Sequence, residues 1–174
     1  TVAGFFSGSG LVLQNTGGLT VGTIAGTPVG DLNGLFAPAQ IVNISTTGLL
    51  TLQQGVVAAG LTTVSAGINQ TGGLLITPQF AFFSGGNVSL EKANQVGTIA
   101  GSATGDVSFT NNQTLNVGTV GILSGITTGG GNLRLVAGDT TAITGFGIHV
   151  LAGDLNAGAG DITLMGSGFV QDAG

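Results

Sequence analysis

The chain has 174 residues, 5% of them charged, with two Lys or Arg against seven Asp or Glu and a net charge of −5. Binding to nucleic acid or to anionic lipid headgroups requires clustered basic side chains, and two basic residues cannot form such a cluster. The chain also lacks Cys, which excludes disulfides and thiolate metal sites. These counts exclude nucleic acid as a partner.

Hydrophobic residues make up 42% of the chain. Disordered chains combine low hydrophobicity with high charge, so this composition predicts a folded protein. No apolar run approaches the ~18 residues that a membrane-spanning helix needs. The longest candidates, such as residues 56–59, end at a Gly. We therefore expect no insertion into a membrane.

Short strand cores of the form apolar–x–apolar follow one another along the chain. Their middle residue is usually polar, and this period of two is typical of strands with one buried and one solvated face. Helical spacing does not persist, because Gly interrupts every candidate window. In chain order the predicted cores are residues 11–13, 19–21, 50–52, 74–76, 88–90, 107–109, 115–117, 133–135, 148–150 and 162–164.

Clusters of Gly and Asn separate the strand cores. Both residue types accept the positive φ that sharp corners require. Such corners suit either antiparallel hairpins or the bends of a β-helix, and the strand pattern alone does not decide between them. The clusters lie at residues 15–18, 30–31, 71–73, 85–87 and 129–132.

A long internal repeat favours the β-helix. Residues 5–26 and 82–101 share the motifs FFSG and VGTIAG, and the second motif starts at Val21 in the first copy and at Val96 in the second. Within this super-repeat, matching cores recur at roughly twenty residues, as in solenoids whose coils bury their apolar faces by stacking. We expect one all-β domain over residues 1–174, a parallel β-solenoid of about eight coils. At roughly 4.8 Å per coil it would form a rod about 40 Å long.

The repeats resemble those of filamentous-haemagglutinin-type exoproteins. The resemblance lies in VGTIAGSATGDVSFTNNQTLNVGTVGILSGITTGGGNLRL (residues 96–135) and GDLNAGAGDITLMGSG (153–168). It implies a right-handed parallel β-helix, exported through an outer-membrane transporter by two-partner secretion. It further implies a rod-shaped adhesin or stalk on the surface of Gram-negative bacteria. We therefore expect the chain to be a segment of a longer repeat protein.

The acidic residues offer little chemistry. Asp31, Asp106, Asp154 and Asp161 each sit beside Gly at a corner, where Asp commonly hydrogen-bonds local backbone. Only Asp154 and Asp161 could form the carboxylate pair that a polysaccharide-degrading β-helix needs. The segment ending in Gly160 and Asp161 resembles calcium-binding repeats, but it occurs once, and such sites need stacked copies.

The basic residues and the single His give no site either. Arg134 and His149 occupy the middle, outward slots of their strands, and a metal pair would need a second His. Glu91 and Lys92 are adjacent in a loop. We therefore predict no catalytic, cofactor-binding or metal-binding residues, and we expect that the protein is not an enzyme.

Two Phe clusters are related by the repeat, Phe5-Phe6 and Phe80-Ala81-Phe82-Phe83. Adjacent residues on a strand point to opposite faces, so one ring of each pair should lie outside the core. Such a ring is either covered by an overlying loop or part of an apolar patch for lateral association or receptor contact.

The leading functional hypothesis is a non-enzymatic adhesive or structural segment of a secreted, cell-surface rod. Its expected partners are an unidentified receptor or glycan on a host or neighbouring cell, and the outer-membrane transporter during export. One alternative is a self-assembling extracellular filament, since unpaired strand edges invite stacking end to end. Another is a polysaccharide-degrading enzyme, if Asp154 and Asp161 line one groove.

Overall fold

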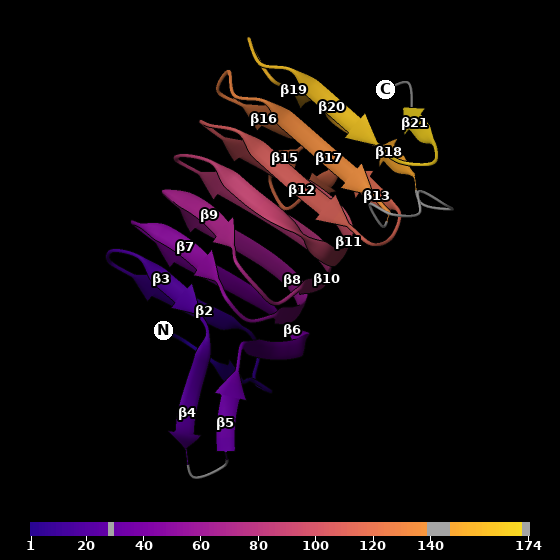
Figure 1. Ribbon diagram of the computed structural model, residues 1–174. Coiled ribbons are helices and arrows are strands. Elements are labelled where there is room, and N and C mark those ends of the chain that lie inside the picture. The colour runs from indigo at the N-terminus through magenta and orange to yellow at the C-terminus, as the bar shows by residue number, and fades with distance from the viewer. Residues whose placement is uncertain (28–29, 139–146, 172–174) are drawn as a thin grey trace.

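The computed structural model describes residues 1–27, 30–138 and 147–171, and these ranges are all-β (Figure 1). Most strands belong to one large parallel sheet that is curled on itself. The described residues contain no helix, so they include no helical membrane span. The parallel pairing decides between the two uses of the Gly-rich corners. Four of the five predicted corners lead to a strand on the other side of the curled sheet, and only residues 30–31 belong to an antiparallel hairpin.

Short strands form one side of the curled sheet, which we call ladder 1. Every neighbouring pair in it is parallel. Ladder 1 contains seven strands in the described residues. They are β3 (Leu19–Val21), β7 (Leu49–Leu52), β9 (Gly67–Gln70), the beginning of β11 (Val88–Ala103), β12 (Val107–Asn111), β17 (Leu133–Ala137) and β20 (Ile162–Met165).

The other side, which we call ladder 2, combines four strands of ten or more residues with strands of two to five residues. The strand β11 runs through both ladders, because its first residues pair with β9 and β12 and its later residues pair with β10. The remaining strands of ladder 2 are β1 (Gly4–Phe5), β2 (Leu11–Asn15), β6 (Leu35–Thr46), β8 (Val56–Ser65), β10 (Leu75–Ser84), β13 (Leu115–Val117), β16 (Ile126–Thr128), β18 (Ile148–Val150), β19 (Leu155–Asn156) and β21 (Phe169–Gln171).

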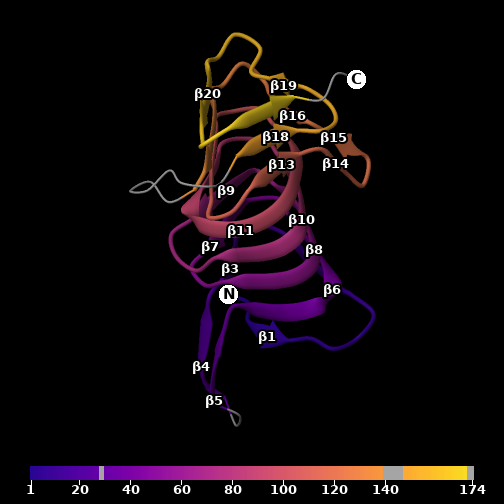
Figure 2. The same cartoon turned by 90° about the vertical axis from the view of Figure 1, so that its right-hand side faces the viewer.

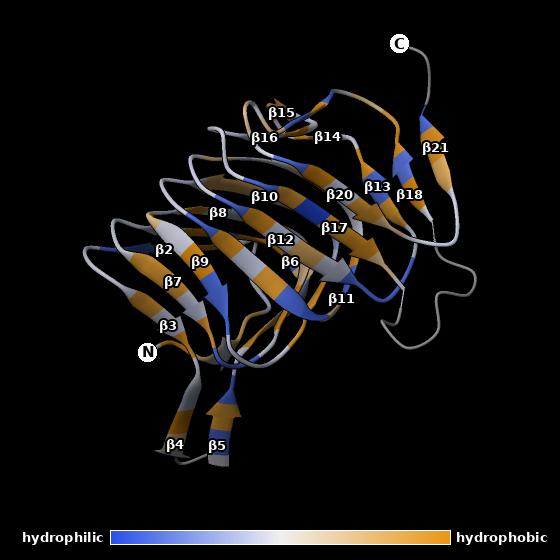
Figure 3. Ribbon diagram, turned by 45° about the horizontal axis from the view of Figure 1, so that its top comes forward, coloured by the Kyte–Doolittle hydropathy of each residue, from blue (hydrophilic) through white to orange (hydrophobic). Residues whose placement is uncertain are grey.

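In the middle of the chain, the spacing between paired residues agrees with the repeat of the strand cores. Leu75 pairs with Val56 on the preceding strand of ladder 2, and Ile99 pairs with Val117 on a following one. Successive strands therefore stack equivalent side chains in columns, and along each strand the columns alternate between the inner and the outer face of the sheet. Figure 3 shows the result as alternating polar and apolar bands along the strands.

Elsewhere, two antiparallel hairpins in the described residues increase the number of residues between paired positions. The pair β4 (Thr23–Thr27) and β5 (Gly30–Asn33) projects away from the sheet, at the foot of Figures 1 and 2, and the chain between β3 and its partner β7 is longer for this reason. The pair β14 (Thr119–Val120) and β15 (Leu123–Ser124) lies on the outside of ladder 2, where Val120 and Leu123 pack on Ala81 and Ala100. The sequence pattern did not predict either insertion.

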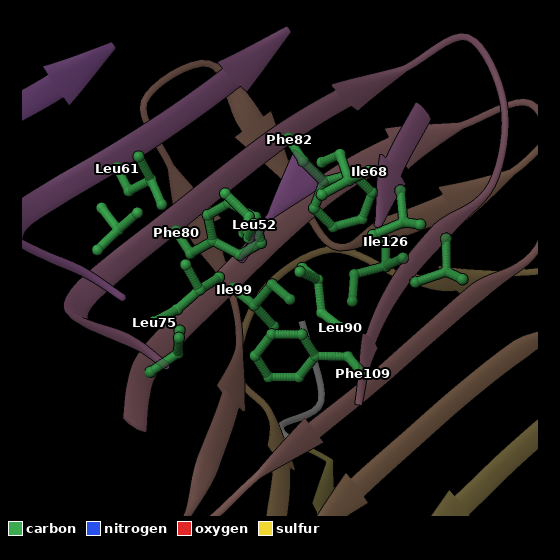
Figure 4. Close-up of a cluster of buried hydrophobic side chains, with 14 of the residues drawn as sticks. Leu52, Leu61, Ile68, Leu75, Phe80, Phe82, Leu90, Ile99, Phe109 and Ile126 are labelled. Carbon is green, nitrogen blue, oxygen red and sulfur yellow. The ribbon is translucent and has the colours of Figure 1, made fainter. Parts of the chain in front are cut away.

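One continuous core lies between the two ladders. Its aliphatic side chains come from both, for example Leu50 and Ile68 from ladder 1 and Leu61 from ladder 2. The fully buried rings of Phe80, Phe82 and Phe109 lie among them (Figure 4). The centroid of the Phe80 ring is 5.7 Å from that of Phe82 and 6.3 Å from that of Phe109. Apolar burial of this kind is the main stabilising contribution to folding.

Buried amide side chains pair with main-chain groups at strand ends and at the shift of register in β11. The Asn94 side-chain oxygen accepts hydrogen bonds from the Leu75 amide (2.9 Å) and from Gln70 Nε2 (2.8 Å). The Asn111 side chain accepts from the Val96 amide and donates to the Val96 carbonyl, both at 2.8 Å. Asn94 and Asn111 are completely buried. They satisfy backbone groups that would otherwise be unpaired in the interior.

The two copies of the super-repeat do not occupy equivalent places in the sheet. Phe5 pairs with Phe36 on the outside of ladder 2, whereas Phe82 lies in the core and pairs with Thr63. The repeated VGTIAG begins at the end of β3 and enters the β4 hairpin strand in its first copy, but it lies within β11 in its second. The matching sequences therefore do not stack in one column.

The predicted core at residues 74–76 is shifted by one residue in the structure. Leu75 is fully buried, and Ile76 lies exposed on the outer face. All three residues are apolar, so the alternation could not indicate which of them face inward.

Candidate functional site

The carboxylates and amides at the corners form a series of hydrogen bonds along one edge of ladder 1. The Asn87 side-chain oxygen accepts from the Asp106 amide (3.0 Å), and a carboxylate oxygen of Asp106 accepts from the Asn132 amide (2.7 Å). The Asn132 side-chain oxygen in turn accepts from the Asp161 amide (3.0 Å). Each side chain thus holds the corner of the next strand. The corner role expected of Asp106 and Asp161 from their place beside Gly is therefore met by bonds between turns, not by the expected bonds within each turn.

The structure places Asp154 and Asp161 on different ladders. The Asp154 carbonyl accepts from the Ile126 amide in ladder 2, and the Asp161 carbonyl accepts from the Leu133 amide in ladder 1. Among the described residues no hydrogen bond joins the two carboxylates, and no three His, Asp or Glu side chains gather as a metal site.

Arg134 and His149 are half-buried and lie in different columns. Arg134 pairs with Ser108 and Thr163 in ladder 1, and its guanidinium contacts the Met165 sulfur at 3.8 Å. His149 pairs with Asn116 and Val170 in ladder 2. The two side chains therefore lie on separate ladders.

The outer face of ladder 1 presents one polar column along its whole length. Each member pairs in register with the next, and six of the seven carry a hydroxyl or an amide. Ser108 also donates a hydrogen bond to the Glu91 carboxylate at 2.6 Å. The column consists of Thr20, Thr51, Asn69, Ser89, Ser108, Arg134 and Thr163.

The outer face of ladder 2 begins with an apolar column instead. Phe5 pairs with Phe36, Phe36 with Val57, and Val57 with Ile76. Phe5 is 72% exposed and Phe36 is 44% exposed, and their ring centroids are 5.4 Å apart. Phe6 packs against the core, so the expected division of the Phe5-Phe6 pair between the two faces is confirmed.

Two hollows interrupt the outer face of ladder 2. A cleft of about 380 Å³ lies where β6 bends and is lined by Phe5, Phe6, Ser7, Phe36, Pro38, Ala39 and Gln40. A groove of about 350 Å³ lies beside the β14–β15 hairpin, with Ile41, Gly60, Gln79 and Val120 among its lining residues. The sequence pattern indicates Phe5-Phe6 but not Phe36 and Gln40, which lie beside this pair only because β1 pairs with β6.

A third cavity, of about 440 Å³, lies among the last strands. Its lining includes Ile148, Leu155, Phe169 and Asp154. Asp161 is not part of this lining. The two hollows of ladder 2 have no charged lining residue, an arrangement that can bind a neutral surface or ligand. Comparison with protein-family models, with curated proteins and with solved structures gave no match.

Proposed function

We propose that this chain is a non-enzymatic segment of a secreted, cell-surface rod that mediates attachment or acts as a stalk. The rod would be a right-handed parallel β-helix of about eight coils, as the repeats of filamentous-haemagglutinin-type adhesins imply. The observation that carries the proposal is the uninterrupted parallel register of ladder 1 from Thr20 to Thr163. Stacked repeats of this kind form extended scaffolds with long lateral binding surfaces.

The distribution of side chains supports an attachment role over a catalytic one. Aliphatic residues fill the interior, and hydroxyl, amide and apolar groups form long columns outside. Attachment through such a surface depends on many weak contacts, whose summed avidity can exceed any single affinity by orders of magnitude. The expected partner is a receptor or glycan on a host or neighbouring cell.

A cell-adhesion assay tests this proposal. Beads that carry the intact chain should adhere to epithelial cells, or to cells of a Gram-negative bacterium, in greater number than beads that carry an unrelated β-rich protein of similar net charge. Soluble chain should reduce this adhesion by competition. Failure to adhere to any cell type at a high density of chain on the beads would contradict the attachment role.

A second candidate function is a self-assembling filament. Ile162 and Phe169 pair with the buried Leu133 and Ile148, yet both are exposed on the last strands of their ladders. A further strand stacked on this edge would bury them. Electron microscopy of the pure chain distinguishes the candidates, because fibres that lengthen with concentration favour the filament and single short rods favour the attachment segment.

A further inference from the structure

We propose that the cleft at the bend of β6 binds a single neutral sugar ring. The cleft is the space of about 380 Å³ between Phe5, Phe36 and the segment from Pro38 to Gln40. This inference deepens the proposed function, on which it rests for its biological role, by naming a ligand class and the residues that bind it.

A local irregularity of β6 builds the cleft. Ala37 pairs with Ala58, and the next paired residue of β6, Ile41, pairs with Gly60. The strand β6 thus advances from position 37 to 41 while β8 advances only from 58 to 60, so β6 accommodates extra residues here. The neighbouring pair of strands has no such insertion, since β8 and β10 keep a constant offset along their whole pairing. Bulges of this kind commonly lie beside functional sites, where they redirect side chains.

The bulge forms one wall of the cleft, and two aromatic rings form the other. The Phe5 and Phe36 rings are inclined at 59° to each other with their centroids 5.4 Å apart. Both rings are open to solvent, although burial would stabilise them. The negative faces of aromatic rings attract the positively polarised C–H groups on the apolar side of a sugar ring.

The polar groups of the cleft suit the hydroxyl groups of a sugar. Ser7 offers a hydroxyl, and Gln40 offers an amide that can both donate and accept hydrogen bonds. None of the lining residues is charged, so the cleft offers no partner to a charged ligand. Small-molecule sites combine such apolar walls with a few polar groups and have volumes of about 300–1,000 Å³. The observed volume lies near the lower limit of that range, which suits one ring rather than a helix or a strand.

A titration of the intact, isotope-labelled chain followed by NMR tests the inference. The probes are the methyl glycosides of galactose, glucose and mannose, and phenol serves as a non-sugar ring. At least one glycoside should shift the resonances of Ser7, Phe36 and Gln40, with a dissociation constant on the order of 1–10 mM for a single ring. The inference would be overturned if no glycoside shifted these resonances up to about 100 mM, or if only phenol did so.

Substitutions then locate the site. Phe36→Leu retains an apolar side chain but removes the aromatic face, and it should weaken binding by about two- to tenfold. Gln40→Ala should weaken it by a similar factor. Ile122→Ala is the matched control, because Ile122 is 93% exposed at the tip of the β14–β15 hairpin and lies outside the cleft. Unchanged binding by both cleft variants, with native-like spectra, would refute the assignment.

The two proposals fail in different ways. If a glycoside binds in the cleft but beads carrying the chain do not adhere to cells, the attachment function is wrong and the site is correct. If the beads adhere and no glycoside binds, the site is wrong and the attachment function is retained.

Discussion

The replacement of Asn111 by Ala gives a direct test of the amide pairing inside the sheet. The Asn111 side chain pairs with both main-chain groups of Val96 and also donates to the Gln113 carbonyl at 3.1 Å. Asn111 is fully buried, so water cannot readily replace its amide. Ala would leave the amide and carbonyl of Val96 without their partner.

The expected loss of stability follows from those two backbone groups. A buried donor or acceptor without a partner costs about 1–3 kcal/mol. Two such groups predict that Asn111→Ala lowers the free energy of unfolding by about 2–6 kcal/mol. Asn111→Asp should also be destabilising, because a carboxylate can accept from the Val96 amide but cannot donate to its carbonyl.

Urea denaturation followed by far-ultraviolet circular dichroism measures this effect. The neighbouring substitution Asn112→Ala is the matched control, since it removes the same side chain from an exposed position. That control should change stability by no more than about 0.5 kcal/mol. If the Asn111 variant unfolds at the same urea concentration as the Asn112 variant, the reasoning about the buried amide is refuted.

Three other substitutions test the core and the corners. Gly101→Ala places a Cβ 2.2 Å from the Phe82 ring, so it should destabilise the fold by about 1–3 kcal/mol in thermal unfolding. Phe82→Ala should lower the free energy of unfolding by about 3–5 kcal/mol. The double variant should be more stable than the sum of the two losses predicts, because the clash disappears with the ring. Strict additivity would contradict the contact between position 101 and the Phe82 ring. Asp106→Ala removes the acceptor of the Asn132 amide and should lower the free energy of unfolding, measured by urea titration, by about 0.5–1.5 kcal/mol. Asp106→Asn keeps an acceptor oxygen and should retain most of the stability. Equal losses in the two variants would show that the corner bond contributes nothing.

The period-two alternation predicted the strands of both ladders where one polar residue lies between two apolar ones. Val107 and Phe109 point inward from β12 and Ser108 points outward, as expected. The same rule cannot choose a face in an all-apolar run such as residues 74–76. The parallel pairing and the regular spacing of the strand cores also follow from the sequence, because stacked coils need equivalent residues at a constant offset.

The repeated hexapeptide shows where local sequence stops being informative. In its first copy, Ile24 lies exposed on a hairpin strand and pairs with Leu32. In its second copy, Ile99 is fully buried and pairs with Phe80 and Val117. The six residues are identical, so the difference arises from the neighbouring strands. Strand preference depends on such neighbours more than on intrinsic backbone preference.

Polar residues in the core could not be predicted by alternation either. The rule assigns polar residues to the solvated face, yet Gln70, Asn94 and Asn111 are buried and face one another or the backbone. Gln70 and Asn111 end their strands and Asn94 lies at a shift of register in β11, and the alternation marks neither kind of position. The cleft was missed for a related reason, because Phe5 and Phe36 are distant in the sequence and meet only through strand pairing.

The inserted hairpins make the fold a natural carrier for foreign peptides. The chain leaves ladder 2 at the β14–β15 hairpin and then rejoins its column, with Gly101 paired to Ile126. Because loop closure costs only about 0.6 kcal/mol more for each doubling of loop length, an epitope grafted between Gly121 and Ile122 should be displayed without disturbing the scaffold. A vaccine or biosensor designer could therefore lengthen that tip freely and leave the columns beneath it unaltered.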